Sequence, residues 1–409
     1  MANKIYLDNA ATTPLDKKVF ESMKPYFSDK FGNASSIHSF GIVASEAVEK
    51  ARGQVADFFG SQTNEIIFTS GATESNNWAL KGVTKKYQAE NKKIPHIITT
   101  AFEHSCVLES CKALERNKKA EITYLPVYKD GIVKIEDIQK AIKPNTLLIS
   151  IMYVNNEIGT VQPIAEIGRL IKKINEANKL KAESHKLLFH TDATQAINYF
   201  DCKVDKLGVD LLSMSAHKIY GPKGVGVLYI RKGTPIVRKQ DGGAQEFGLR
   251  AGTLNTPGIV GLGKAIEQVK SRKLKVKSIV SLRDYLIQKV LKEIPDSNLN
   301  GSKIKRSPNN ANFIFSRVEG ESLLMMLDAE GVFGSTGSAC SSGSLKPSHV
   351  LLSLGLKPEE AHSSLRLTLG KDTTKKDIDY TSRVIKKVVE KLRKFSGNVL
   401  EDFYKNNNS

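Results

Sequence analysis

The amino-acid sequence predicts an α/β protein with a large three-layer domain, built on a mostly parallel sheet, and a smaller α+β domain. Two observations lead to this class. Between residues 60 and 230, short apolar runs rich in β-branched residues alternate with patterns typical of helices, as in sheets covered by helices on both faces. After Pro257, strand-like runs are few and lie between longer helical stretches, which indicates a second, smaller unit.

The large domain is expected over residues 16–257. Its strands are predicted from nearly continuous apolar runs, which are Glu65–Thr69, His96–Thr100, Ile122–Val127, Leu147–Met152, Lys186–Thr191, Val209–Met214 and Val225–Ile230. Helices are predicted between them from 3.6-residue periodicity, at Glu74–Tyr87, Glu103–Asn117 and Pro163–Asn178. Alternation of this kind favours parallel strands joined by helical crossovers.

The smaller domain is expected over residues 258–396, joined by residues 1–15, with a frayed tail at 397–409. The elements predicted along it are a long helical stretch from about Ile259 to Glu293, a strand at Ala311–Ser316, a helix at Glu319–Glu330, a loop of small residues at 334–344, a short helix, a strand at Leu365–Leu369 and a final helix at Thr374–Phe395.

Lys and Arg number 61 and Asp and Glu number 43, which gives a net charge of +18 at pH 7. Such an excess suggests a nucleic-acid partner. The basic residues are nevertheless spread over stretches such as 264–306 and 371–394, where Val, Leu and Ile interrupt them at helical spacing. Because no nucleic-acid-binding motif accompanies the charge, we interpret it as solvated, Lys-rich helix faces and expect no nucleic-acid partner.

Membrane, secreted and metal-binding classes lack support. The longest mainly apolar stretch, 147–154, is far shorter than the roughly 20 residues of a membrane-spanning helix, and the first residues contain no apolar run typical of a secretory signal. The four cysteines form no CxxC pair, and the histidines show no metal-ligand spacing. We therefore expect a cytoplasmic protein with free thiols and without a metal.

Loops after three predicted strands carry reactive residues, and open α/β sheets bind ligands beyond the carboxyl ends of their strands. Residues 70–74 (SGATE) open a helix, whose free N–H groups and dipole suit a phosphate. Asp192 follows another strand, where a carboxylate is costly unless it meets a cation. Lys218 lies between two buried strands, where loss of hydration would make its amine more nucleophilic.

A lysine, an aspartate and a phosphate cradle at neighbouring strand ends are the groups that bind pyridoxal phosphate. The lysine would hold the aldehyde covalently, and the aspartate would keep the pyridine nitrogen protonated. The same spacing also suits a salt bridge between Asp192 and Lys218 at the loop ends, so spacing alone leaves both interpretations open.

Two further residues lie in the smaller domain. Cys340 belongs to residues 334–344 (GSTGSACSSGS), where no large side chain is available for packing. We expect this loop to be mobile and Cys340 to act as a nucleophile rather than as a buried structural thiol, whereas Cys106, Cys111 and Cys202 are expected to be structural. Arg366 lies inside a strand pattern and suits bidentate capture of a carboxylate, although an exposed strand arginine would look the same.

Together these residues resemble the cysteine desulfurases of the NifS/IscS family, in the aminotransferase class-V group of fold-type-I pyridoxal-phosphate enzymes. The resemblance runs from about Tyr6 to Gly370, and its specificity comes from many short motifs in the same order. They are YLDNAATTP (6–14), FGNASSIHSFG (31–41), FTSGATESNN (68–77), EHSCV (103–107), NNEIGTVQP (155–163), HTDATQ (190–195), SAHKIYGPKGVG (215–226), RAGTLN (250–255), GSACSSG (337–343) and SLRLTLG (364–370).

The resemblance implies how the cofactor is held. Lys218 carries it, Asp192 pairs with the pyridine nitrogen, and Gln195 pairs with the ring hydroxyl. His104 stacks on the ring and can take part in proton transfer. The phosphate is held by Gly71, Ala72, Thr73, Ser215 and His217.

The resemblance also implies a substrate site and a partner subunit. Thr253 matches a threonine that reaches the phosphate from the other chain, which implies a homodimer. Asn155 and Arg366 hold the carboxylate of L-cysteine, and Cys340 accepts its sulfur. The chain departs from the family at Phe247, where relatives often carry arginine. The wall of the site that faces the partner subunit is therefore expected to differ in detail from the family pattern.

The implied reaction converts L-cysteine to L-alanine and leaves a persulfide on Cys340. The persulfide then passes to a sulfur-acceptor protein, an iron–sulfur scaffold or a sulfur carrier, for iron–sulfur cluster assembly, tRNA thiolation or both. The alternatives are a selenocysteine lyase or an aminotransferase of the same fold, and a basic nucleic-acid- or tRNA-docking protein on an inactive fold. The loop cysteine speaks against an aminotransferase, and the complete residue set against an inactive fold.

Overall fold

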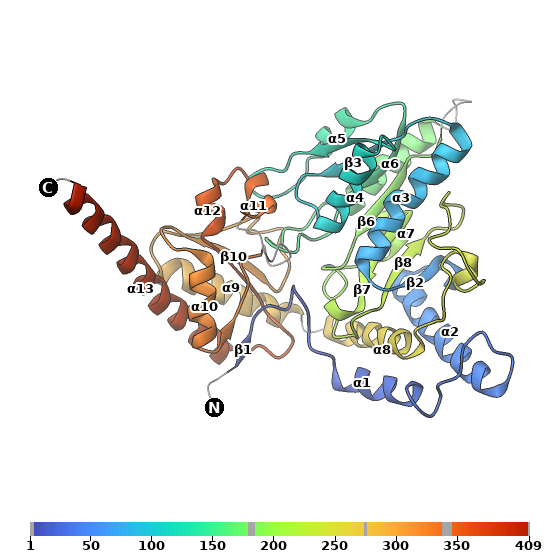
Figure 1. The fold of residues 1–409 in the computed structure, drawn as a ribbon, viewed down its shortest axis with the longest axis horizontal. Helices are drawn as coiled ribbons and strands as arrows, with labels where there is room; N and C mark the ends of the chain where they lie inside the picture. The colour runs from blue at the N-terminus through green and yellow to red at the C-terminus, as the bar shows by residue number, and fades with distance from the viewer. Residues whose placement is uncertain (1–3, 179–184, 274–275, 338–345, 408–409) are drawn as a thin grey trace.

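The computed structural model of the chain describes residues 4–178, 185–273, 276–337 and 346–407. A large central sheet fills one half of the molecule, and two small sheets lie in the other half (Figure 1). The strands of the large sheet, in spatial order, are β2 (Ile66–Thr69), β8 (Gly226–Ile230), β7 (Leu211–Ser215), β6 (Leu188–Asp192), β5 (Thr146–Ser150), β3 (His96–Thr100) and β4 (Glu121–Leu125).

The large sheet is parallel except at β8, which pairs antiparallel with both β7 and β2. The reversal follows from chain length, because residues 216–225 are too few to form the helical crossover that a parallel pair requires. The prediction of a mostly parallel sheet is confirmed.

Helices cover both faces of this sheet, which explains the continuous apolar runs of its strands. On one face, α3 and α4 pack on side chains such as Ile97, Leu148 and Leu188. On the other face, α2, α6 and α8 pack on the alternate residues, such as Ile98 and Phe189. The helices of this half are α1 (Lys17–Met23), α2 (Ser39–Phe59), α3 (Ala72–Asn91), α4 (Ser105–Arg116), α5 (Ile135–Ala141), α6 (Ile164–Asn178), α7 (Val204–Leu207) and α8 (Thr256–Lys273).

The other half has an apolar core of its own, centred on Phe313, Phe315 and Leu367. The antiparallel sheet β12-β10-β9 lies there, and the N-terminal β1 pairs with β11. The elements are β1 (Ile5–Tyr6), α9 (Val276–Glu293), β9 (Ser297–Leu299), β10 (Asn310–Phe315), α10 (Gly320–Ala329), β11 (Val332–Phe333), α11 (His349–Ser353), α12 (Pro358–His362), β12 (Ser364–Thr368) and α13 (Lys375–Asn407). We propose two domains on the basis of this separate core, with the boundary after α8 rather than at the predicted 257/258, because α8 packs in the core of the large half.

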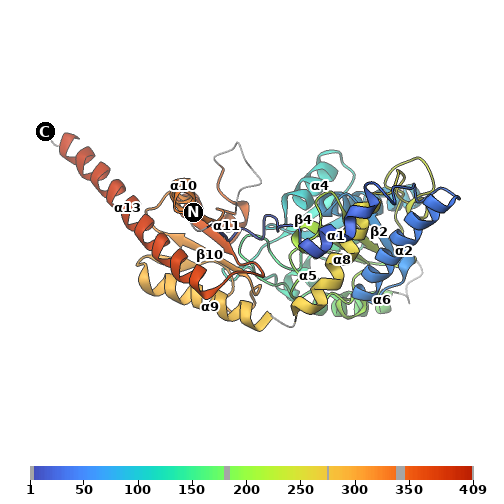
Figure 2. The ribbon, with the colours of Figure 1, turned by 90° about the horizontal axis from the view of Figure 1, so that it is seen from below.

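The long helical stretch predicted from about Ile259 to Glu293 corresponds to α8 and α9. One prediction for the C-terminal half was wrong. The tail expected to fray is helical, because α13 continues to Asn407 and projects beyond the rest of the molecule (Figure 2). Within the described part of the chain, none of the helices is both long and apolar enough to cross a membrane.

Candidate active site

A cavity of about 620 Å³ opens at the carboxyl ends of β2, β6 and β7, between the two halves of the molecule. Open α/β sheets bind ligands at this edge. The structure brings most of the sequence-predicted site residues into its wall, namely Gly71, Ala72, Thr73, His104, Asp192, Gln195, Ser215, His217, Lys218 and Arg366.

Lys218 and Asp192 reach the cavity from neighbouring strand ends. Lys218 ends a single turn of 3₁₀ helix after β7, and its Nζ donates hydrogen bonds to the carbonyl oxygens of Ala10 and Ala11, at 2.5 and 2.6 Å. Asp192 is the last residue of β6 and is only 6% exposed. Its carboxylate accepts hydrogen bonds from the Asn76 side chain, at 2.6 Å, and from the backbone N–H of Thr194.

His104 is held as a neutral imidazole above the start of α4. Its Nδ1 accepts from the backbone N–H of Cys106 at 3.1 Å, which places the ring proton on Nε2. Burial lowers the pKa of His104 and so favours this neutral form. The Cys106 Sγ lies 3.0 Å from the same Nδ1, and Cys106, which was predicted to be structural, lines the cavity.

Cys106 is nevertheless a poor nucleophile. Burial raises the pKa of the Cys106 thiol to about 12, and the negative charge of Asp192 is the second-largest cause. The thiolate is the reactive form of cysteine, so the Cys106 thiol stays protonated and unreactive near neutral pH.

The N-terminus of α3 forms one wall of the cavity. Gly71 precedes the helix with φ of 154°, a backbone conformation that favours glycine, and no described side chain caps the helix here. The first-turn carboxylate of Glu74 is paired with Arg250 at 3.1 Å. Opposite this helix end, burial and the neighbouring cations of Lys218 and Lys223 lower the pKa of His217 to about 4. This wall combines free helix N–H groups, hydroxyls and a neutral imidazole.

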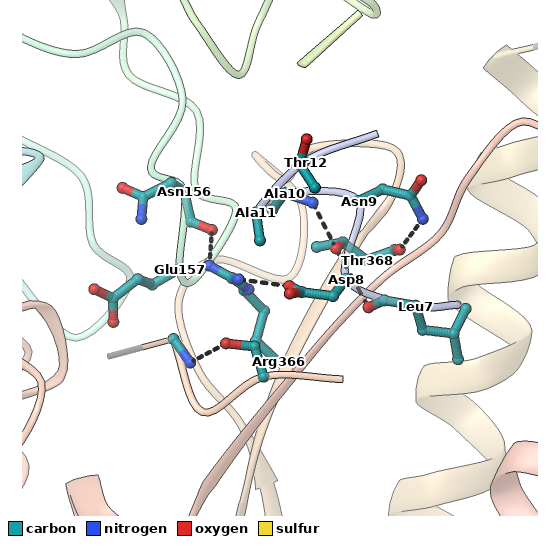
Figure 3. Close-up of polar contacts among 12 residues, drawn as sticks. Leu7, Asp8, Asn9, Ala10, Ala11, Thr12, Asn156, Glu157, Arg366 and Thr368 are labelled. Carbon is teal, nitrogen blue, oxygen red and sulfur yellow. Dashed lines mark hydrogen bonds and ion pairs between the residues drawn. The ribbon is translucent and has the colours of Figure 1, made fainter. Parts of the chain in front are cut away.

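Arg366 approaches from the smaller half, on β12 (Figure 3). Its guanidinium donates to the Asp8 carboxylate at 2.7 Å and to the carbonyl oxygen of Asn156 at 3.1 Å. The arginine is buried rather than an exposed strand residue, with a side chain 4% exposed. A buried cation beside the cavity suits the capture of an anionic group.

Three predicted residues are not found in the cavity wall. Asn155 is buried, and its side chain donates to the Phe102 carbonyl and accepts from two backbone N–H groups. The adjacent Asn156 lines the cavity in its place. Thr253 is exposed on the surface of the single chain. Cys340 lies outside the described residues.

Sequence reasoning also missed residues that the structure places at the site. Thr12 and Asn156 line the cavity, while Asp8 and Asn76 lie behind its wall and hold Arg366 and Asp192. All four fall inside or beside the short motifs of the sequence, but a motif alone does not tell which member faces a ligand.

The sequence matches the family described as Aminotransferase class-V over residues 5–381. The chain belongs to this family. A protein named Cysteine desulfurase IscS, from Dictyoglomus turgidum, is 52% identical over 397 residues, which cover 97% of each chain.

Two solved structures resemble this chain over most of its length. A NifS-like protein has a TM-score of 0.86 and 38% identity, with 95% of this chain and 99% of that chain covered. A structure described as SspA in complex with cysteine has a TM-score of 0.76 and 38% identity, over 89% of this chain and 98% of that chain. The predicted resemblance to NifS/IscS cysteine desulfurases, and the fold class that it implies, are confirmed.

Proposed function

We propose that the protein is a cysteine desulfurase, which uses pyridoxal phosphate to convert L-cysteine to L-alanine and transfers the sulfur to an acceptor protein. The observation that carries the proposal is the convergence of Lys218, Asp192, His104 and Arg366 on one cavity. Membership of the class-V family and the 52% identity to an IscS protein support it.

The residues of the cavity fit pyridoxal phosphate. The wall at the N-terminus of α3 offers N–H groups and the hydroxyls of Thr73 and Ser215, which suit a phosphate. The Thr194 hydroxyl is buried and has no hydrogen-bond partner among the described residues. It is therefore available to form a hydrogen bond with a ligand in the cavity. We assign Lys218 to the aldehyde, Asp192 to the pyridine nitrogen and Gln195, with His104 over the ring, as the family resemblance implies. Bound pyridoxal phosphate would withdraw electrons from the substrate Cα.

The protein side chains would bind the amino acid and move its proton. Arg366 has the charge and burial to hold the substrate carboxylate, with Asn156 taking the place we predicted for Asn155. The amine of Lys218 is suited to take the Cα proton. The neutral His104, with its proton on Nε2, is suited to donate a hydrogen bond to the substrate.

Cys340 would accept the sulfur. In the overall reaction the C–S bond of L-cysteine breaks, the sulfur joins Cys340 as a persulfide, and a proton takes its place on carbon to give alanine. The described residues on both flanks support this assignment. Gly337 lines the cavity, and beyond residues 338–345 the Ser348 hydroxyl contacts the Glu157 carboxylate at 2.5 Å.

We further propose a homodimer in which Thr253 completes the phosphate site of the partner subunit. The exposure of Thr253 in one chain is compatible with this role. Several exposed apolar side chains also lie on α1, on α2 and on the segment between them. A partner chain that packed on this part of the surface would cover these side chains. Its members are Phe20, Phe27, Phe31, Ile37, Phe40 and Ile42.

A sulfur carrier or an iron–sulfur scaffold is the proposed acceptor, and the cytoplasm is the proposed compartment. The described cysteines Cys106, Cys111 and Cys202 form no disulfide with one another, which suits a reducing environment.

The proposal is tested by incubating the holoenzyme with L-cysteine and a reductant, and measuring sulfide and alanine. We expect both products in equal amounts, with Cys340→Ala losing sulfide release. Cys111→Ala is the matched control, because Cys111 is fully buried and burial raises the pKa of its thiol to about 12. No alanine from the wild-type protein, or unchanged sulfide release by Cys340→Ala, would contradict the assignment.

A further inference from the structure

A short segment near the N-terminus touches both ends of the cavity. This N-terminal turn, residues 8–12, gives the carbonyl oxygens of Ala10 and Ala11 to the Lys218 ammonium. At its other end, the Asp8 carboxylate binds the Arg366 guanidinium at 2.7 Å (Figure 3). Lys218, which we assign to the cofactor aldehyde, and Arg366, which we assign to the substrate carboxylate, are therefore tied to the same few residues.

The N-terminal turn is rigid. The Tyr6 hydroxyl donates to the carbonyl oxygens of both Asp8 and Thr12, at 3.0 Å each. The turn is also fixed to β12, because the backbone N–H of Ala10 donates to the Thr368 hydroxyl at 2.8 Å. The Asp8 side chain thus projects from a backbone held on two sides, and its carboxylate is a fixed anchor.

The Arg366 guanidinium donates two of its five N–H groups to acceptors of the protein. One terminal nitrogen binds Asp8, and the other donates to the Asn156 carbonyl at 3.1 Å. The Nε–H is buried and has no acceptor among the described residues. Two contacts fix the plane of a guanidinium, so its remaining N–H groups have a defined direction.

We propose that Asp8 is a positioning residue for the substrate carboxylate, which acts by fixing Arg366 relative to Lys218. The inference rests on the proposed function. An α-amino acid carries its amine and its carboxylate on one carbon, so the cation that binds the carboxylate must lie at a set distance from the lysine. Asp8 meets this need because it belongs to the turn that also contacts Lys218.

The test compares two ligands that differ only in a carboxylate, L-alanine and ethylamine. Their affinities for the holoenzyme are measured by calorimetry and by the absorbance of the bound cofactor. Asp8→Ala should weaken L-alanine binding on the order of tenfold and leave ethylamine binding within about twofold, because a hydrogen-bonded ion pair that orients the cation is lost. Asp8→Asn keeps an oxygen acceptor for Arg366 and should bind L-alanine within about threefold of wild type.

Two further variants separate positioning from structure. Asn9→Ala removes a neighbouring bond of the same turn, from the Asn9 side chain to the Thr368 carbonyl at 2.8 Å, without touching Arg366, and it should leave the alanine-to-ethylamine ratio unchanged. Asp8→Glu keeps the charge but displaces the carboxylate, and it should weaken L-alanine selectively even if Asp8→Ala does not fold.

Several results would overturn the inference: equal weakening of both ligands by Asp8→Ala or Asp8→Glu, tighter alanine binding in Asp8→Ala, or the same ratio change in Asn9→Ala. Failure of the proposed function would look different, because the wild-type protein would then produce no alanine from L-cysteine.

Discussion

Replacing Glu246 by glutamine should destabilise the large half of the protein. Glu246 accepts two hydrogen bonds from the Arg52 guanidinium, at 2.7 and 2.9 Å, and the two side chains are 1% and 3% exposed. The Arg52 guanidinium also lies between the rings of Phe68 and Phe247, 4.7 and 5.0 Å from their centroids. The substitution keeps the size and shape of the side chain but removes its charge and turns one of its two acceptor oxygens into an NH2 donor, which would face a donor N–H.

The expected cost follows from burial. The other carboxylate partner of Arg52, Glu49, lies at 3.0 Å but is 54% exposed, so Glu246→Gln leaves the buried end of the cation without a counter-charge, which costs about 3–5 kcal/mol. Changing both residues, Arg52→Met with Glu246→Leu, removes the buried charge. It leaves the Phe68 N–H without its acceptor, Glu246, at 2.7 Å, and it removes the Arg52 donor, at 2.6 Å, from the Ile66 carbonyl. The orphaned Phe68 N–H costs about 1–3 kcal/mol, and the Ile66 oxygen loses only one of its two acceptor sites, which costs less, so the double variant should be more stable than Glu246→Gln.

Urea unfolding followed by tryptophan fluorescence measures these differences, because the chain has a single tryptophan, Trp78, which is 2% exposed in the core of the large half. Asp296→Asn is the matched control: it removes the surface pair with Arg317, whose side chains are 57% and 69% exposed, and should cost under about 1 kcal/mol. A loss below about 1 kcal/mol for Glu246→Gln, or a double variant no more stable than it, would refute the reasoning.

Other predictions concern the site and its surroundings. Lys218→Ala should lose the absorbance of the bound cofactor and all turnover, and retention of both would exclude Lys218 as the cofactor lysine. Cys106→Ala should keep most of the sulfide release, because the buried Cys106 thiol stays protonated; a loss comparable to that of Cys340→Ala would contradict this. Mixing Lys218→Ala with Thr253→Ala subunits should restore one intact site per heterodimer, measured as cofactor retention above that of the Thr253→Ala homodimer, whereas no rescue would place Thr253 within its own chain. Burial lowers the pKa of His96 to about 4. Between about pH 6.5 and 4 the unfolded chain therefore binds a proton at His96 that the folded protein does not bind, and this favours unfolding. Urea stability should therefore fall as the pH drops from about 6.5 to 4, and His96→Gln should flatten that dependence; an unchanged slope would show that His96 is not responsible.

The sequence predicted the large sheet well because its signal is local. Strands buried on both faces consist of apolar residues without interruption, and the helices between them repeat every 3.6 residues. The two- and three-residue strands β1, β11 and β9 carry no such signal. Their pairing depends on distant chain segments, so no window of sequence reveals them.

The candidate site was predicted where a strand end carries a reactive side chain, as at Asp192 and Lys218. The choice between Asn155 and Asn156 could not be made in this way, because the two neighbours are chemically identical. Asn155 is turned inward because its side-chain oxygen accepts from the N–H groups of Glu157 and Ile158, a local turn that leaves Asn156 to face the cavity.

The N-terminal turn also determines when the site can form during synthesis. Asp8 and Arg366 are 358 residues apart in sequence. The ribosome makes residues 8–12 long before their partners on β12, because the whole segment between them is made first. Because a contact between distant residues must await closure of the whole intervening loop, the turn is unpaired through most of translation. The large half can fold earlier as a unit, but the cavity acquires its last wall only when β12 leaves the ribosome, so the enzyme cannot act as a nascent chain.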